Sequence, residues 1–481
     1  MNAQIIKLFV FITICFGALV GFTSYWSVFD AKDLKEKSVN KRPFFEAQQI
    51  KRGKILAADG SVIAESKPVG EGASRQFVRE YPNGPLWGHP IGYNFAQFGN
   101  AEFEKSHNSE LIGENSEFTT ILDELRGRKQ VGHDVTTSLD PTAQQTAVDL
   151  LAGRPGAVVA IEPSTGRVKA MVSEPPYDPN LIPDDFSEIN KDPGSPIVDR
   201  AVQGQYPPGS TFKLVTAAAA LDSGVIDGDT TIDSPASLDI QGSPLSNDFQ
   251  QPFGEINVTT ALTNSVNTFF AQLGEKVGED TLYEYMDKFG FNEKPQVDLP
   301  EESKAISGVF GPNGLLEPGE GVDIARIAIG QERLLATPIQ MAEVASTIAN
   351  DGTLMKPQIW DEVRDVDGRT LDTMDPEVQS DVISEDSAAT LTEAMKAVVN
   401  EGTGTAAALS GIDVAGKTGT AEVPDQERCE GLPNQAWFVG FAPADDPQIA
   451  VAATVECTDG QGGTVAAPIA AGVMQTLIGD Q

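Results

Sequence analysis

A serine and a lysine three residues apart stand at the start of an apolar helix. They lie in Tyr206–Leu221, where Pro207-Pro208-Gly209 prevents an earlier helix start and the residues after Ser210 are helix formers. Side chains at i and i+3 share one helical face, so Ser210 and Lys213 lie within reach of each other. Burial favours the neutral, proton-accepting amine of Lys213. The pair predicts a serine nucleophile with a lysine base; the alternative is a capping serine and a lysine that extends to solvent.

Histidine is absent from residue 150 to residue 481. A Ser–His–Asp triad or a histidine-bound zinc centre within this stretch is therefore excluded, and serine chemistry there needs another base. The three histidines of the chain, His89, His107 and His133, show no metal-ligand spacing, which predicts surface or packing roles. Because the chain also lacks a nucleotide-binding glycine loop, we expect neither a metal site nor a cofactor.

A hydroxyl and an amide two residues apart follow in the segment Thr263–Thr268. Ser265 and Asn267 lie in a turn that precedes an expected helix over 268–273. Serine and asparagine are ordinary turn residues, so this pair alone is a weak signal. Its weight depends on the other motifs of the chain.

A predicted strand over 413–423 carries a cation, two hydroxyls and a glycine in succession. These residues are Lys417, Thr418, Gly419 and Thr420. The glycine would let a ligand backbone approach closely, and the cation with the two hydroxyls suits a carboxylate. The alternative is an edge strand with a solvated lysine.

The charge of the chain excludes one class of partner. The 481 residues contain 34 Lys and Arg against 70 Asp and Glu, a formal net charge of −36. A field of that sign repels nucleic acid, so we expect no nucleic-acid partner, and it also disfavours a polybasic contact with a membrane surface. The length predicts two or three domains.

The N-terminus contains a run without charged side chains, from Leu8 to Phe29. As a helix this run would span about 33 Å, enough to cross a bilayer. Tyr25 and Trp26 occupy the place of an interfacial aromatic belt. A cleaved signal peptide is the alternative, but no A-x-A-like cleavage site is present. We therefore expect residues 1–30 to form one transmembrane anchor, with the rest of the chain outside the membrane.

The remaining chain changes composition near residue 150. A charged stalk over 30–40 and a strand hairpin over 52–64, which turns at Asp59-Gly60, begin the first part. The second part has strand-like runs at both ends, over 156–162, 167–173, 413–423, 436–442 and 449–456, around a helix-rich stretch over 200–400, and ends in a helix over 464–477. Distant strands that share one sheet predict an α+β fold. We expect an anchor (1–30), a first domain (31–150) and a large α+β domain (151–481).

Ser-x-x-Lys, Ser-x-Asn and Lys-Thr-Gly occur in the order that is the signature of serine β-lactamases and penicillin-binding proteins. The sequence resembles the penicillin-binding transpeptidases, in particular the membrane-anchored class B type. Further segments that fit this family are Arg52-Gly53, Tyr177–Asn180, Ile329–Gln331 and Gly402–Ala406. The resemblance implies a transpeptidase domain, with an antiparallel sheet, helices on both of its faces and an all-helical subdomain, preceded by a β-rich pedestal (dimerisation-like) domain over 31–150.

The resemblance also implies roles for the motif residues. Ser210 would be the acylated nucleophile and Lys213 its proton acceptor, while Ser265 would relay protons and Asn267 would hold the donor amide. Lys417 and Thr418 would orient Ser265 and the substrate carboxylate, a contact shared by Thr420, with Gly419 between them. The backbone N–H groups of Ser210 and Thr420 would form the oxyanion hole.

The implied activity is that of a serine-type D-Ala-D-Ala transpeptidase in the bacterial cell membrane, which cross-links peptidoglycan stem peptides for cell shape or division and is inhibited covalently by β-lactams. The implied partners are stem peptides, β-lactams, the membrane, a SEDS-family glycan polymerase and division or elongation proteins. A D,D-carboxypeptidase and a sensor or scaffold that binds β-lactams without turnover remain alternatives. A serine β-lactamase fits less well, because no Glu-x-x-Leu-Asn pattern follows Ser265.

Two of the three cysteines, Cys429 and Cys457, lie beyond the predicted anchor, where disulfides are permitted. One follows the Lys-Thr-Gly strand and the other ends the last predicted strand. If those strands are neighbours, a disulfide could join them beside the active site. The compartment favours this disulfide, and two free thiols are the alternative.

Overall fold

The structure, a computed structural model, describes residues 2–26, 49–70, 76–114, 130–423 and 429–479. Its first helix, α1 (Asn2–Ser24), is exposed from residue 4 onward. Among the described residues it is the one helix long and apolar enough to cross a membrane. The charged stalk predicted over 30–40 lies outside the described residues.

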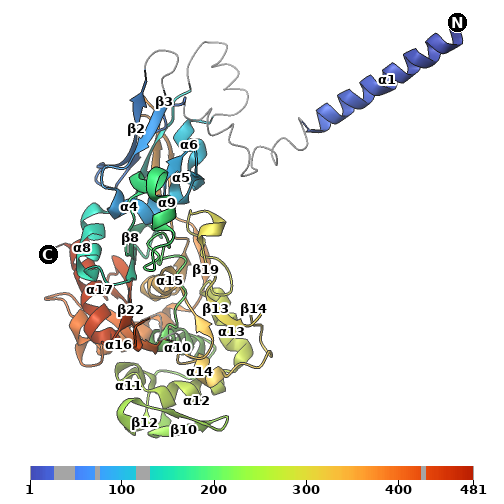
Figure 1. The fold of residues 1–481 in the computed structure, drawn as a ribbon. Helices are drawn as coiled ribbons and strands as arrows, with labels where there is room; N and C mark the ends of the chain where they lie inside the picture. The colour runs from blue at the N-terminus through green and yellow to red at the C-terminus, as the bar shows by residue number, and fades with distance from the viewer. Residues whose placement is uncertain (1, 27–48, 71–75, 115–129, 424–428, 480–481) are drawn as a thin grey trace.

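A five-stranded antiparallel sheet forms the centre of the molecule (Figure 1). In spatial order its strands are β20 (Ala415–Glu422), β21 (Asn434–Ala442), β22 (Ile449–Thr458), β7 (Gly156–Ile161) and β8 (Val168–Glu174). Two strands from the start of the large domain thus pair with three from its end, and the predicted α+β fold is confirmed.

Helices cover both faces of this sheet, because each strand presents apolar side chains on two sides. Val159 of β7 packs into one hydrophobic core and the adjacent Val158 packs into a second. On the first face lies α15 (Pro338–Ala349). On the other face lie α8 (Pro141–Leu151) and α17 (Gly462–Ile478).

A helical region extends the molecule on the side opposite the N-terminal sheet (Figure 1). Its helices are α10 (Lys213–Asp222), α11 (Val258–Thr263), α12 (Asn267–Val277), α13 (Glu279–Lys288) and α14 (Ile324–Ile327). Short strands β9 (Ile232–Ser234), β10 (Ser237–Ile240), β11 (Ser243–Ser246) and β12 (Gly254–Ile256) form two hairpin-like pairs at its end. The helix α16 (Glu385–Asn400) packs on α11 and on β20, and so connects this region with the sheet.

The pedestal contains a six-stranded sheet with strands from two distant parts of the chain. In spatial order the strands are β18 (Thr370–Thr373), β17 (Trp360–Arg364), β6 (Asp134–Thr137), β1 (Ile55–Leu56), β2 (Val62–Val69) and β3 (Gln76–Glu80). The predicted hairpin over 52–64 forms the pair β1–β2. The strands β17 and β18 were not predicted from the sequence, and they join the pedestal to the large domain through the sheet itself.

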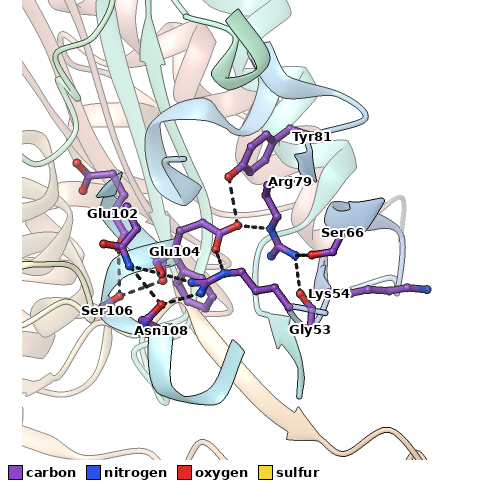
Figure 2. Close-up of polar contacts among 12 residues, drawn as sticks. Gly53, Lys54, Ser66, Arg79, Tyr81, Glu102, Glu104, Ser106 and Asn108 are labelled. Carbon is purple, nitrogen blue, oxygen red and sulfur yellow. Dashed lines mark hydrogen bonds and ion pairs between the residues drawn. The ribbon is translucent and has the colours of Figure 1, made fainter. Parts of the chain in front are cut away.

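A buried ionic cluster holds the pedestal together around Glu104 of α5 (Glu102–Ser106). Arg52 and Arg79 donate from their Nε atoms to its two carboxylate oxygens at 2.7 and 2.5 Å, and Tyr81 donates its hydroxyl at 3.2 Å. Figure 2 shows Glu104 directed toward Arg79 and Tyr81. Burial opposes ionisation of this carboxyl, but the two guanidinium groups hold its pKa below the usual range. Removal of the Glu104 carboxylate would leave two uncompensated buried guanidinium groups, which is strongly destabilising.

Glu343, in the middle of α15, is a buried acid that predicts a pH dependence of stability. It is 2% exposed, and its Oε1 has no hydrogen-bond partner within the part of the chain that the structure describes. Burial, reinforced by Glu293, raises its pKa to about 8. The unfolded chain ionises this group near its ordinary value, whereas the folded protein keeps it protonated. The folded state therefore loses stability as pH rises from about 4.3 toward 8, by at most about 1.4 kcal/mol per pH unit.

The variant Glu343→Gln keeps the shape of the side chain but cannot ionise, so this loss should disappear. We expect the unfolding midpoint of the detergent-solubilised variant to exceed that of the wild type at pH 8, with a smaller difference at pH 5.5. Glu275→Gln, at an exposed position of α12, is the control. An equal change of both variants with pH would contradict the prediction.

Candidate active site

Ser210 lies in the short 3-10 helix η4 (Gly209–Phe212), which leads directly into α10. The loop before it is fixed by two backbone contacts: the N–H of Gly209 donates to the carbonyl oxygen of Gly330 at 2.9 Å, and Trp437 donates from Nε1 to that of Pro207 at 3.0 Å. Gly209 has a φ of +53°, and a Cβ at Gly330 would lie 1.9 Å from the Gly209 carbonyl oxygen. Both positions therefore require glycine.

Lys213, the first residue of α10, is fully buried. Its Nζ lies 2.6 Å from Oδ1 of Asn267, 2.7 Å from the carbonyl oxygen of Ser265 and 3.1 Å from Ser265 Oγ. Desolvation, and then the positive charge of Lys417, lower the pKa of Lys213 well below its usual range, although Asp248 acts in the opposite direction. These surroundings favour the neutral, proton-accepting form of the amine. Within the described residues Lys213 forms no hydrogen bond with Ser210.

Ser265 is the point at which two lysines meet. It lies between α11 and α12 with a φ of +56°, a left-handed conformation that is unusual for serine. Its Oγ accepts a hydrogen bond from Lys417 Nζ at 3.0 Å. The Nζ of Lys213, the lysine of the Ser-x-x-Lys motif, lies 3.1 Å from the same Oγ. Lys417 is also fully buried, and desolvation lowers its pKa to about 7. Asn267, at the start of α12, donates from Nδ2 to the carbonyl oxygen of Ser246 at 3.0 Å.

The edge strand β20 packs its motif against the nucleophile loop. A Cβ at Gly419 would lie 2.8 Å from the carbonyl oxygen of Pro208, so glycine permits a close approach of protein backbone here. The hydroxyls of Thr418 and Thr403 lie 2.6 Å apart. The hydroxyl of Thr420 accepts a hydrogen bond from the N–H of Gly462 at 3.0 Å.

A pocket of about 670 Å³ opens in front of these groups. Of the residues predicted from the sequence, Ser210, Ser265, Asn267, Thr418 and Thr420 line it. Lys213 and Lys417 lie behind Ser265, and Gly419 faces the nucleophile loop. The pocket-lining residues that sequence reasoning missed include Asp248, Phe249, Glu332, Thr403 and Asn434. They belong to loops and strand ends without a local motif, so only the tertiary structure reveals them.

The structure joins Cys429 and Cys457 by a disulfide, with their Cα atoms 5.0 Å apart. The bond connects the segment between β20 and β21 to the end of β22. The disulfide therefore lies at the end of the central sheet where β20, the strand with the Lys-Thr-Gly residues, ends.

Two family models match separate parts of the chain. The penicillin binding protein transpeptidase domain matches residues 156–475, and the penicillin binding protein A dimerisation domain matches residues 52–135. The chain is 33% identical over 497 residues to the peptidoglycan D,D-transpeptidase PbpA of Mycolicibacterium smegmatis, covering 98% of this chain and 97% of that protein. It is 32% identical over 431 residues to MrdA of Escherichia coli, covering 79% and 68%.

Solved structures are similar over the same extent. Penicillin-binding protein A from M. tuberculosis, as an acyl-enzyme complex with ceftriaxone, superposes with a TM-score of 0.80 at 32% identity, covering 90% of this chain and 100% of that one. A D,D-transpeptidase domain from Eggerthella lenta superposes with a TM-score of 0.76 at 35% identity, covering 89% and 98%. The similarity thus includes the pedestal as well as the central sheet.

Proposed function

The chain belongs to the class B penicillin-binding protein family, and on that premise we propose that it is a peptidoglycan D,D-transpeptidase with Ser210 as its nucleophile. The observation that carries the proposal is the convergence of Lys213 and Lys417 on Ser265, beside Ser210 in one pocket. This arrangement supplies a base and a proton route without histidine.

The reaction proceeds in two steps. The Ser210 Oγ attacks the carbonyl carbon of the D-Ala–D-Ala peptide bond while its proton passes to Lys213; the C–N bond then breaks, and the proton goes to the amine of the released D-Ala. An amine of a second stem peptide attacks the resulting ester and loses a proton to the same base, which returns it to the Ser210 Oγ as the ester C–O bond breaks. The backbone N–H groups of Ser210 and Thr420 stabilise the oxyanion in both steps.

Hydrogen-bond counting supports a proton route through Ser265. A neutral Lys213 amine has two N–H bonds, and the carbonyl oxygens of Ser265 and Asn267 accept them at 2.7 and 2.6 Å. Its third contact, at 3.1 Å, is the Ser265 hydroxyl, which can therefore donate to the lysine lone pair. The same hydroxyl accepts a hydrogen bond from Lys417, so Ser265 connects the two lysines and can relay a proton between them.

The terminal carboxylate of the substrate fits the β20 side of the pocket. Thr418 and Thr420 present hydroxyls there, and the cation of Lys417 lies behind them. A β-lactam offers the same carboxylate beside a reactive carbonyl, so it acylates Ser210 in place of the donor peptide. The contact of the substrate carboxylate with Thr418, Thr420 and Lys417 orients the scissile bond toward Ser210.

The remaining parts of the chain suit a membrane-attached cell-wall enzyme. Helix α1 anchors the protein in the bacterial cell membrane in a single pass, and the catalytic domain faces the extracytoplasmic side, where the Cys429–Cys457 disulfide is stable. A SEDS-family glycan polymerase and proteins of the division or elongation machinery are the partners we propose for the pedestal and the anchor.

The test is a cross-linking assay with the detergent-solubilised full chain, a pentapeptide donor stem and an amine-bearing acceptor stem. We expect cross-linked dimer, release of D-Ala, and one penicilloyl adduct per chain by intact mass after exposure to penicillin. Release of D-Ala without dimer would favour the D,D-carboxypeptidase. An adduct without D-Ala release would favour the sensor or scaffold, and no adduct at all would overturn the proposal.

A further inference from the structure

We propose that Glu456 and Tyr206 are positioning residues for the nucleophile, and that the Cys429–Cys457 disulfide holds Glu456 in the place where it acts. The proposal rests on the proposed function, because it concerns the rate at which Ser210 is acylated. None of these residues belongs to the three motifs, and none of them lines the catalytic pocket.

Glu456 lies behind the nucleophile loop as the centre of a buried polar contact. Its Oε1 accepts a hydrogen bond from the Tyr206 hydroxyl at 2.5 Å and another from Arg200 Nε at 2.8 Å. The exposed fractions are 4% for Glu456, 7% for Tyr206 and 7% for Arg200. In such surroundings these bonds are strong and directional, so they fix the ring of Tyr206.

Tyr206 passes this constraint to the loop that carries Ser210. It precedes Ser210 by four residues, and its backbone exchanges both hydrogen bonds with Ala336, at 3.0 and 2.8 Å. Its ring meets the edge of Trp437 with centroids 6.1 Å apart, and the same Trp437 donates to the carbonyl oxygen of Pro207. The loop is thus held from one side by Glu456 and from the other by the strand β21.

Glu456 lies on the same face of β22 as Ala450 and Ala452, the face toward the core that contains Tyr206, and an irregularity of the strand begins at this residue. Val455 pairs with Ala436 and Thr458 pairs with Asn434, so two residues, Glu456 and Cys457, stand opposite the single residue Gln435. This is a β-bulge, a feature that redirects a side chain and that is common next to active sites. Cys457 has a φ of +52°, a conformation that costs energy for a residue other than glycine.

The disulfide acts on the second residue of this bulge. Cys457 is bonded to Cys429, which belongs to the segment between β20 and β21. The covalent bond restricts the rearrangements that would relieve the left-handed residue and flatten the bulge. Loss of the left-handed conformation at Cys457 would shift the backbone next to Glu456 and so displace its carboxylate from Tyr206.

The first test is Tyr206→Phe, which removes only the hydroxyl and keeps the ring on Trp437. Stopped-flow acylation by penicillin should show a first-order acylation rate lower by roughly 10- to 100-fold, with the non-covalent dissociation constant unchanged, because a small displacement of Ser210 affects the reaction more than binding. The matched control is Tyr285→Phe. The hydroxyl of Tyr285 donates to the Asp222 carboxylate at 2.7 Å, and this contact does not involve the nucleophile loop. The control should acylate at the wild-type rate.

The second test separates position from charge and includes the disulfide. Glu456→Gln retains an oxygen acceptor and should recover most of the acylation rate that Glu456→Ala loses. The double variant Cys429→Ser/Cys457→Ser should also lower the acylation rate. Adding Tyr206→Phe to it should lower the rate little further, because the loss of the disulfide and the loss of the hydroxyl both act on the contact between Tyr206 and Glu456.

Three results would overturn the proposal. These are wild-type acylation by Tyr206→Phe, wild-type acylation by the double serine variant, and equal losses of rate and of melting temperature in Tyr206→Phe and Tyr285→Phe. If the wild-type protein itself forms no penicilloyl adduct, the proposed function fails instead, so the two failures are distinguishable.

Discussion

Replacing Ser210 by alanine is expected to abolish both the penicilloyl adduct and the cross-linked dimer. In the proposed mechanism the Ser210 Oγ forms the ester, and Ser210 lines the pocket three residues before the lysine base. Because alanine fits the short 3-10 helix, the fold should persist. Intact-mass measurement after incubation with penicillin detects the adduct directly, and chromatography of the stem-peptide products measures the cross-linked dimer.

Ser223→Ala provides the control for this change, because Ser223 follows the far end of α10, and among the described residues its hydroxyl donates to the carbonyl oxygen of Ala219 in that helix. It should retain a full adduct. An adduct of the same mass on the Ser210→Ala protein would place the nucleophile elsewhere and would remove Ser210 from the mechanism.

Replacing Lys213 by methionine should lower the acylation rate by about 10²- to 10⁴-fold, the usual contribution of a general base. Methionine preserves the apolar stem inside the helix but removes the amine that accepts the Ser210 proton. Burial holds the pKa of this lysine well below its value in the unfolded chain. Folding therefore carries a cost at neutral pH that the variant lacks and that opposes the loss of the hydrogen bonds to Ser265 and Asn267, so its melting temperature should stay close to that of the wild type.

The two readouts together distinguish a base from a structural lysine. A structural role would lower the melting temperature and the acylation rate together, whereas the proposed role lowers only the rate. Lys276→Met, at an exposed position of α12, is the control and should change neither. Normal acylation by the Lys213→Met protein would contradict the assignment of the base.

The central sheet was predictable because its strands are buried on both faces. Such strands appear in the sequence as continuous apolar runs, and the runs over 156–162 and 449–456 correspond to β7 and β22. The strands β17 and β18 could not be found in this way. Both strands are short; β18 is exposed along its whole length, and β17 is mostly half-buried with one buried residue, Val363, so no apolar pattern marks them.

The candidate site was predictable where its chemistry is local. Ser210 and Lys213 are three residues apart at the start of one helix, and the Lys-Thr-Gly residues share one strand, so the spacing indicates which residues lie near one another. Glu456 and Thr403 could not be recognised, because their contacts, with Tyr206 and with Thr418, join segments that meet only after folding. Sequence reasoning also could not predict that Lys213 would bond Ser265 and Asn267 rather than Ser210.

The pairing of β17 with β6 sets the order in which the molecule can be completed during synthesis. Ser138 and Gln358, which meet beside this pair, are 220 residues apart along the chain. Since the ribosome makes β6 long before β17, the pedestal sheet must wait with β6 as an open edge, a state prone to wrong pairing. A polypeptide that stops before residue 360 would therefore lack a finished pedestal as well as a finished catalytic sheet. Premature termination far downstream would thus damage the part of the protein that is synthesised first.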